Sequence, residues 1–344
     1  MRTLKYSQAL SEGLIQAMDA DPNVFVMGIG VDYPSGIFGT TYEAFQKFGA
    51  SRVFDTPACE NALTGIAIGA ATQGKRPLLV HARNDFMFLG FDQMLNLAAK
   101  WRYMFGGKSG VPIVIRGIIG KGWGQGATHS QSLQSVLAHF PGLCVVMPAF
   151  PQDAKGLMLG ALQSSGPIVI LEHRSLYDTT GPVAEAAEPT PIGKAAVVRP
   201  GKDVTIVATS WMAVEALHAA LTLASKEGID AEVVDLRSIR PLDEQTVLAS
   251  VHKTGRLVVA DTSWRLFGVA SEIAALAAES AFDSLKAPVR RVTLPDCPCP
   301  ASHALEKAFY PSASTIADAV RDILGMQRNK GSQFHGEDKF LGPY

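Results

Sequence analysis

A single carboxylate stands at the start of a predicted helix that is otherwise built almost wholly from small and apolar residues. From Phe54 to Gly74 the sequence is FDTPACENALTGIAIGAATQG, and the carboxylate is that of Glu60. Pro57 disfavours the α conformation at Thr56, and the apolar residues beyond Glu60 recur at helical spacing, so we expect the helix to begin near Glu60. A glutamate in a first turn often does no more than complement the positive end of the helix dipole. The alternative is a partly buried carboxylate that hydrogen-bonds a ligand, and the residues alone leave both interpretations open.

A glycine-rich segment, GIIGKGWGQGATHSQS, occupies residues 117 to 132 and contains the second candidate, His129. So many glycines after a predicted strand indicate a loop whose backbone approaches a ligand or adopts positive φ angles. The glycine spacing fits neither a P-loop nor the dinucleotide-binding fingerprint. A histidine in a polar loop is usually just solvated, but one that follows such a loop could also act as an acid or base near neutral pH.

Four functional side chains follow directly on an apolar strand in the segment HARNDFMFLGFDQ, residues 81 to 93. They are Arg83, Asn84, Asp85 and Phe86. Ligands of parallel α/β proteins bind beyond the carboxyl ends of the strands, so this cluster lies where a site is expected. Phe86 either packs in the core, which is the commoner fate of Phe, or stacks on a flat heteroaromatic ring.

The composition is that of an ordinary globular protein with no general electrostatic attraction to polyanions. Of the 344 residues, 47% are hydrophobic and 18% charged, and 31 basic against 32 acidic residues leave a formal net charge of -1. This balance argues against nucleic acid or an anionic membrane as a partner. We expect a soluble cytoplasmic protein, because the amino terminus lacks a signal-peptide pattern and no apolar run is long enough to span a bilayer. The cysteines have neither zinc-site nor disulfide-framework spacing, which predicts free thiols.

Short apolar runs alternate with helical patterns along most of the chain, which predicts an α/β protein of two domains, each a mainly parallel sheet covered by helices. We expect a first domain over residues 1–180, a linker over 181–203, a second domain over 204–326 and a polar tail over 327–344. The strands are predicted at residues 24–27, 77–81, 112–115, 144–147 and 168–171, and then at 204–208, 231–236, 257–260 and 289–294. Besides the helix that begins near Glu60, helices are predicted at residues 7–18, 91–104, 213–225, 244–252, 270–279 and 315–324.

Taken in this order and spacing, these features resemble the β subunit of the heterotetrameric E1 component of thiamine-diphosphate-dependent 2-oxo acid dehydrogenases. The similarity runs from about Leu4 to Leu324 and includes DTPACE, GIAIGAA, FDQMLNLAAKWRYMFGG, VPIVIRG, THSQS, FPGLCVVMP and DLRSIRPLD. The resemblance implies a transketolase-like pyrimidine-binding domain followed by a transketolase C-terminal-like domain.

The resemblance also implies roles for three residues of this chain. Glu60 matches the glutamate that hydrogen-bonds N1′ of the cofactor's aminopyrimidine and so promotes the tautomer that activates the cofactor. Phe86 matches the aromatic residue that packs on the pyrimidine. His129 matches the histidine that faces the substrate and assists reductive acyl transfer to a lipoyl group.

The remainder of the site is expected on a second chain. In this family an α subunit binds Mg²⁺ and the diphosphate through a motif that contains Gly-Asp-Gly, and that tripeptide is absent from this sequence. We therefore expect an α2β2 assembly that shares thiamine diphosphate between its subunits, with Mg²⁺ on the α chain and no metal ligand on this one. Gly65 and Gly69, four apart on the Glu60 helix, are then candidate interface residues.

Three functions follow from the resemblance. The first is an E1β subunit that decarboxylates a 2-oxo acid and passes the acyl unit to the lipoyl carrier of an acyltransferase, E2. The second is a thiamine-dependent relative that cleaves acetoin or joins carbon units. It is favoured by the stretch Gly28-Ile29-Gly30-Val31, where family members commonly carry an acidic residue. The third is a non-catalytic scaffold subunit.

Overall fold

The computed structural model describes residues 1–120 and 124–326 in two compact units. The first unit comprises Met1–Gly120, Gln131–Gly193 and Ser238–Pro241. The second comprises Lys194–Arg237 and the described parts of Lys121–Ser130 and Leu242–Tyr344. The predicted tail lies outside the described residues.

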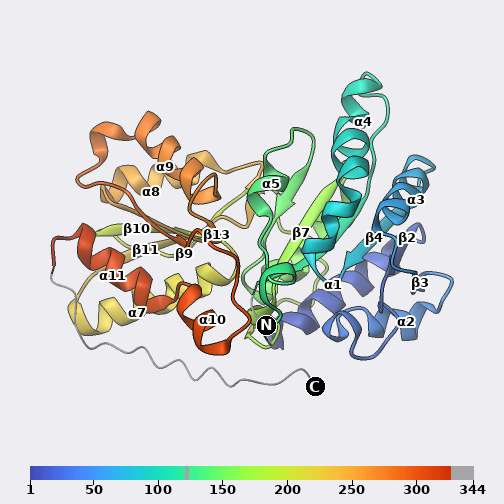
Figure 1. The fold of residues 1–344 in the computed structure, drawn as a ribbon, viewed down its shortest axis with the longest axis horizontal. Helices are drawn as coiled ribbons and strands as arrows, with labels where there is room; N and C mark the ends of the chain where they lie inside the picture. The colour runs from blue at the N-terminus through green and yellow to red at the C-terminus, as the bar shows by residue number, and fades with distance from the viewer. Residues whose placement is uncertain (121–123, 327–344) are drawn as a thin grey trace. The chain divides into compact units, whose positions relative to one another are not determined.

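The first unit is built on a seven-stranded sheet in the order β12-β6-β7-β5-β4-β2-β3, shown in Figure 1 together with its helices. All neighbouring strands are parallel except β12, which is antiparallel to β6. Its strands are β2 (Val24–Gly28), β3 (Val53–Phe54), β4 (Arg76–His81), β5 (Val114–Ile119), β6 (Cys144–Val146), β7 (Ile168–His173) and β12 (Ser238–Arg240). A separate antiparallel pair joins β1 (Arg2–Lys5) to β8 (Thr180–Val183).

Helices connect these strands and cover the sheet, as the alternating pattern predicts. The α-helices are α1 (Tyr6–Ala20), α2 (Tyr42–Phe48), α3 (Glu60–Thr72), α4 (Ala99–Met104), α5 (Gln134–Ala138) and α6 (Pro151–Gln163). Short 3₁₀ helices are η1 (Gly36–Gly39), η2 (Asn84–Gly90) and η5 (Arg174–Leu176). The helix predicted over residues 91–104 differs in its first half, since η3 (Asp92–Ala98) is a π-helix that continues into α4. Single π turns inside helices occur frequently at functional sites.

The central strand β5 carries an arginine that is fully buried. The side chains of Arg116 and Glu172 are both 0% exposed and form an ion pair, and the Arg116 Nη2 also donates to Thr40 Oγ1 at 2.7 Å. Tyr177 donates its hydroxyl to Glu172 Oε2 at 2.8 Å. Burial opposes the charge of Arg116, but the carboxylate of Glu172 raises the arginine pKa overall. A strand predicted over residues 112–115 therefore extends through this charged residue to Ile119, because the charge is neutralised inside the fold.

The second unit has a five-stranded sheet in the order β14-β13-β10-β11-β9. It is parallel except at β9, which is antiparallel to β11. Its strands are β9 (Ala196–Arg199), β10 (Val204–Ala208), β11 (Ala231–Asp235), β13 (Leu257–Trp264) and β14 (Arg290–Leu294). Its helices are η4 (Gly126–Thr128), α7 (Trp211–Glu227), α8 (Glu244–Thr254), α9 (Val269–Ser280), η6 (Phe282–Ser284), α10 (His303–Phe309) and α11 (Ala313–Ile323). Two mainly parallel sheets with helical connections confirm the predicted fold class.

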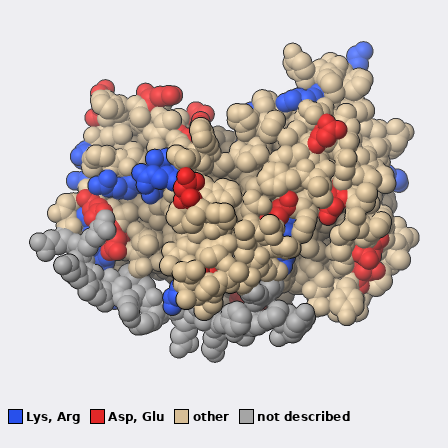
Figure 2. Space-filling model, viewed as in Figure 1, with Lys and Arg blue, Asp and Glu red and all other residues tan. Residues whose placement is uncertain are grey.

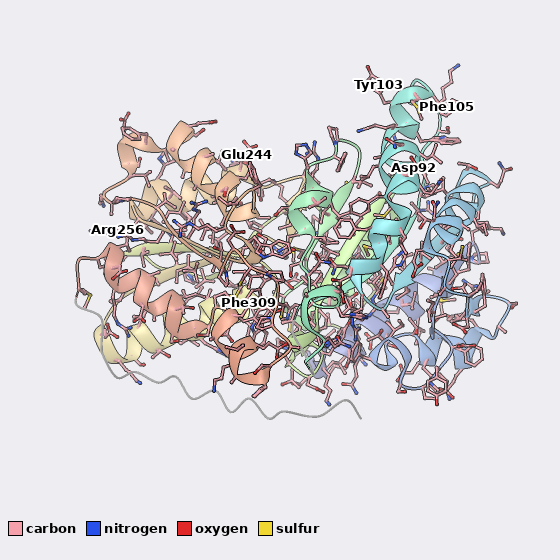
Figure 3. The ribbon with its side chains drawn as sticks, in the orientation of Figure 1. Asp92, Tyr103, Phe105, Glu244, Arg256 and Phe309 are labelled. Carbon is pink, nitrogen blue, oxygen red and sulfur yellow. The ribbon has the colours of Figure 1, made fainter. Side chains whose placement is uncertain are left out.

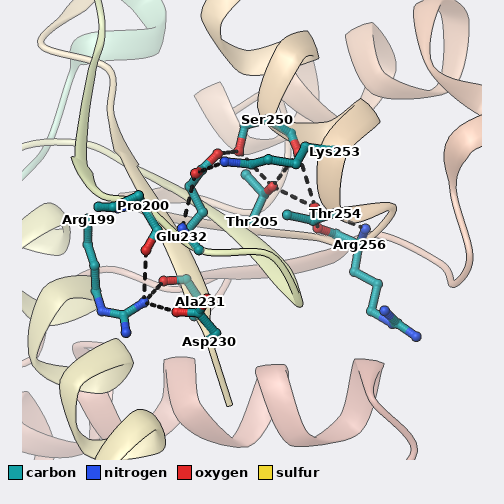
Figure 4. Close-up of polar contacts among 11 residues, drawn as sticks. Arg199, Pro200, Thr205, Asp230, Ala231, Glu232, Ser250, Lys253, Thr254 and Arg256 are labelled. Atoms are coloured by element: carbon teal, nitrogen blue, oxygen red, sulfur yellow. Dashed lines mark hydrogen bonds and ion pairs between the residues drawn. The ribbon is translucent and has the colours of Figure 1, made fainter. Parts of the chain in front are cut away.

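A buried polar network ties α8 to the second sheet (Figure 4). Glu232 of β11 accepts from the Ser250 hydroxyl at 2.6 Å and forms an ion pair with Lys253. Thr205 of β10 shares hydrogen bonds of 2.7 Å with the hydroxyls of Ser250 and Thr254. Burial acts to raise the pKa of Glu232, but the bonds from Lys253 and Ser250 lower it overall. The charge of Glu232 thus stabilises the unit only while its partners stay in place.

The residues predicted as a linker contain two strands, β8 and β9, that lie in different units. Both are at the edge of their sheets, where proline and polar residues are tolerated, so a local search for alternating hydrophobicity does not detect them. Within residues 1–120 and 124–326, no helix has the length and apolar character needed to cross a membrane.

Candidate active site

Glu60 is the first residue of α3, as predicted. Cys59 precedes it in a non-helical conformation with φ -154° and ψ 66°, and the first turn closes through the Leu63 amide, which donates to Cys59 O at 2.9 Å. The Thr64 hydroxyl donates to the Glu60 carbonyl at 2.6 Å, so the backbone of this turn is fixed. The Glu60 side chain is half-buried, and among the described residues its carboxylate has no hydrogen bond or ion pair. A carboxylate at a helix start that is not used inside the fold is available to a ligand.

The element that carries Phe86 packs against the same helical turn. A Cβ placed on Gly90, at the end of η2, would lie 2.6 Å from Thr64 Oγ1 and 3.5 Å from Glu60 O. Only glycine allows this close approach of η2 to the start of α3. Phe86 is 38% exposed, so its ring is not a core residue. The structure thus brings the elements of Glu60 and Phe86 together, and leaves both side chains partly accessible.

Asn84 and Asp85 begin η2 and differ from Glu60 and Phe86, because both are buried and form hydrogen bonds within the protein. Asn84 is 0% exposed and Asp85 is 8% exposed. The Asn84 amide donates to Gln131 O at 2.9 Å and accepts from Leu133 N at 3.1 Å. Asp85 Oδ1 accepts from the Gln131 amide at 3.2 Å. These two side chains hold the backbone that follows the glycine-rich loop, a role that sequence reasoning missed although it had singled out both residues by their place beyond a strand.

His129 belongs to the second unit, so the structure places it only against residues of that unit. It follows η4 and is half-buried, with its Nδ1 3.0 Å from the Thr128 hydroxyl. Gly124 and Gly126 have φ angles of 67° and 66°, and a Cβ on Gly124 would lie 2.8 Å from Ala301 O. The expectation of positive φ in this loop is confirmed at these glycines, while residues 121–123 lie outside the described residues.

A neutral histidine lies at the end of β4, just before the polar cluster. His81 is 6% exposed, and its Nε2 has no hydrogen-bond partner among the described residues. Burial lowers the pKa of His81 to about 4. Its imidazole is therefore neutral at neutral pH, and it adds no charge to the edge of the sheet where Glu60 and Phe86 lie.

The side chains of Glu60 and Phe86 suit a flat heteroaromatic ring that presents a nitrogen to be hydrogen-bonded. A half-buried carboxylate without a protein partner matches a ring nitrogen, and a half-exposed phenyl ring matches a π face. The described residues contain no group of three or more His, Cys, Asp or Glu arranged to hold a metal ion. The four cysteines are all free thiols, as predicted: Cys59, Cys144, Cys297 and Cys299.

Comparison with known families identifies both halves of the chain. Residues 2–180 match the transketolase pyrimidine-binding domain, and residues 193–316 match the transketolase C-terminal domain.

Named relatives cover nearly the whole chain. The β subunit of acetoin:2,6-dichlorophenolindophenol oxidoreductase from Cupriavidus necator is 45% identical over 333 residues, which are 94% of this chain and 98% of that protein. The pyruvate dehydrogenase E1 β subunit from Rickettsia felis is 41% identical over 316 residues, or 92% of this chain and 97% of that protein.

Solved structures show the same fold. A split-gene transketolase, described as an inactive β4 tetramer, has a TM-score of 0.77 at 25% identity and covers 94% of this chain and 100% of its own. A transketolase from Leishmania mexicana has a TM-score of 0.69 at 18% identity and covers 94% of this chain and 46% of its own.

Proposed function

Because this chain belongs to the transketolase-like family of E1 β subunits, we propose that it joins an α subunit and thiamine diphosphate to carry out oxidative decarboxylation of a 2-oxo acid. The observation that carries the site assignment is Glu60, whose carboxylate has no partner among the described residues although it sits on a fixed helical turn.

Each of the three residues has a distinct role in this proposal. Thiamine diphosphate supplies the electron sink that makes loss of CO₂ possible. Glu60 holds and exchanges a proton with the ring nitrogen N1′ of the pyrimidine, and Phe86 orients that ring by packing on its face. His129 moves a proton on the substrate side, during transfer of the acyl unit.

The partner must supply what this chain lacks. The sequence has no Gly-Asp-Gly, the tripeptide that holds Mg²⁺ and the diphosphate in the family's α subunits. The inactivity of the solved β4 relative supports the same division, because a tetramer of β-type chains alone does not turn over. We therefore place the active site in an α2β2 complex, with Mg²⁺ on the α chain.

The acyl acceptor distinguishes two versions of the function. A lipoyl group on an E2 acyltransferase fits the pyruvate dehydrogenase relatives. Cleavage of acetoin fits the relatives named for that substrate, and the stretch Gly28-Ile29-Gly30-Val31, which lacks the usual acidic residue, keeps this second candidate in view. Assay of the reconstituted complex with 2-oxo acids and with acetoin, each with a lipoyl domain or dichlorophenolindophenol as acceptor, separates the two.

Replacement of Glu60 tests the proposed site. In the reconstituted α2β2 complex, we expect Glu60→Gln to lower thiamine-dependent turnover by about 10²-fold or more, because the amide cannot exchange the N1′ proton. Glu244→Gln is the matched control, since Glu244 is also the first residue of a helix, α8, and is exposed (Figure 3).

The control decides between the two interpretations of Glu60. A residue that only complements a helix dipole affects stability by a few tenths to about 1 kcal/mol and leaves turnover intact, and Glu244→Gln should behave in this way. If Glu60→Gln also leaves turnover unchanged, the proposed role of Glu60 is wrong. Robust activity of this chain purified without an α subunit would contradict the division of the site between two chains.

A further inference from the structure

We propose that Asn84 is a positioning residue for acyl transfer. Its side-chain amide holds the backbone of Gln131 and Leu133, which directly follows the segment that carries His129. The inference rests on the proposed function, because it assigns the reaction step that this backbone serves. It concerns a residue that touches neither Glu60 nor His129 in any hydrogen bond of the described residues.

The hydrogen bonds between the Asn84 side chain and the backbone of residues 131–133 resemble those between two neighbouring strands. The Asn84 side-chain amide donates one of its two N–H groups to Gln131 O at 2.9 Å and accepts from Leu133 N at 3.1 Å through its C=O, which lies in the same plane. Asp85 adds a third bond, from the Gln131 amide at 3.2 Å. Residues 131–133 thus receive from two side chains the hydrogen bonds that a neighbouring strand would otherwise provide.

Burial makes these bonds effective. Asn84 is 0% exposed, so water cannot replace a lost bond, and any change at this position leaves backbone groups of residues 131–133 unpaired inside the protein. The second Asn84 N–H bond, to Asp85 Oδ2 at 3.2 Å, fixes which way the amide is turned. The donor therefore faces Gln131 O and the acceptor faces Leu133 N.

The backbone is also constrained where β5 ends. Gly120 has φ 87°, and a Cβ at this position would lie 2.2 Å from His173 Nε2. His129 lies two residues before Gln131 in the sequence, so the Asn84 contact holds the first unit's backbone two residues beyond His129.

Asn84 and Phe86 are also neighbours on one short helix, η2. The same element therefore carries the partly exposed ring of Phe86 and holds the backbone at Gln131 and Leu133. This arrangement gives a physical reason for the sequence Asn-Asp-Phe directly beyond β4: the two polar residues face inward and the aromatic residue faces outward.

A double-mutant cycle in the reconstituted complex tests the inference. We expect Asn84→Ala to lower acyl transfer to a lipoyl domain by at least tenfold, while the thiamine diphosphate Kd changes by less than threefold, because Glu60 and Phe86 remain in place. If Asn84 acts through His129, the double variant Asn84→Ala/His129→Ala should be no slower than His129→Ala alone. Additive losses overturn the proposal.

Hydrogen exchange of the full-length chain supplies a readout that does not depend on turnover. Asn84→Ala and Asn84→Asp should each speed amide exchange at least tenfold in a peptide spanning residues 124–137. The aspartate fails because it cannot donate to Gln131 O and brings a second carboxylate beside Asp85. Asn23→Ala is the control, since Asn23 precedes the amino end of β2, whereas Asn84 follows the carboxyl end of the neighbouring β4, and among the described residues the Asn23 side chain accepts only from Lys75.

The two readouts separate this inference from the proposed function. Unchanged exchange in the peptide of residues 124–137 contradicts the role of Asn84 whatever the activity. If the Asn84 variants exchange faster but the parent complex shows no thiamine-dependent turnover, the contact is supported and the proposed function is contradicted. Without acyl transfer there is no reaction step for Asn84 to position, so its assignment to acyl transfer is then overturned as well.

Discussion

At the scale of residues, the polar side chains near the end of β4 divide by the groups that satisfy them. Asn84 and Asp85 are buried and bonded to backbone, so they act on the protein itself. Glu60 is half-buried and has no partner among the described residues, so its carboxylate is available to a ligand. Sequence reasoning identified all three residues, but it could not separate these roles, because the difference depends on what each side chain meets after folding.

His81 provides a pH-dependent contribution to stability that can be measured. Its pKa of 6.5 in the unfolded chain falls to about 4 in the fold, so the unfolded state takes up the proton first as the pH falls. The stability associated with a neutral His81 is complete above about pH 6.5 and is lost as the pH falls towards 4. Between pH 7.5 and pH 5, we expect this one group to remove about 2 kcal/mol from the free energy of unfolding.

Urea unfolding at the two pH values checks this expectation. His81→Phe keeps a ring in the core but cannot take up a proton, so the variant should lose about 2 kcal/mol less than the parent on going from pH 7.5 to pH 5. His139→Phe, which removes an exposed histidine, serves as the control. Equal losses in the parent and in His81→Phe would show that His81 is not the group responsible.

At the scale of elements, the site depends on how closely η2 approaches α3. The approach occurs at Gly90, where an added Cβ would meet the Thr64 hydroxyl at 2.6 Å. Because Thr64 is 0% exposed and its hydroxyl is bonded to Glu60 O, it cannot move aside without disturbing the turn that carries Glu60. Gly90→Ala should therefore change the spacing of Phe86 and Glu60.

We expect Gly90→Ala to weaken thiamine diphosphate binding to the reconstituted complex by about tenfold, which corresponds to 1.4 kcal/mol. Gly166→Ala is the control, because nothing lies within 4 Å of a Cβ at Gly166, which follows α6 and belongs to neither η2 nor α3. Titration of both variants with thiamine diphosphate by calorimetry measures the effect. Equal affinities for the two variants would mean that the approach of η2 does not set the cofactor site.

The sequence predicts well those helices and strands whose buried apolar residues recur at regular spacing. The strand at residues 204–208 and the start of α3 at Glu60 agree with the structure, because local spacing alone determines them. The strand β12, at residues 238–240, was not predicted, since it is defined only by its antiparallel pairing with the distant β6. The π-helix η3 was predicted as α-helix, because residues four apart share a face in both forms.

At the scale of the whole molecule, this chain carries apolar and small surface that a subunit partner would cover. On α3, Ile66 is 61% exposed, and Gly69 is exposed with no atom within 4 Å of an added Cβ. Tyr103 and Phe105 lie at the end of α4 and are 90% and 51% exposed, with the Phe105 ring packed on Trp101 of the same helix (Figure 3). Exposed apolar side chains of this kind can mark sites of protein association.

Charge does not provide an alternative reason for assembly. On the face drawn in Figure 2, acidic and basic side chains are both present, and broad areas carry neither. The formal net charge of -1 likewise gives no field of a single sign. Association with an α subunit or a second β chain is therefore expected to depend on shape and apolar contact, for which the open glycine on α3 is a sensitive position.

Replacing Gly69 with a large residue tests subunit assembly without disturbing the fold of this chain. Because nothing lies within 4 Å of an added Cβ, Gly69→Arg should leave the fold of this chain intact, and loss of a helical glycine should stabilise α3 by several tenths to 1 kcal/mol. If another subunit packs against α3, the arginine must block it, and light scattering after co-expression with the α subunit should show free chains in place of α2β2. Ser225→Arg, on the exposed side of α7, should assemble normally. Normal assembly of a folded Gly69→Arg variant would place the interface elsewhere than on α3.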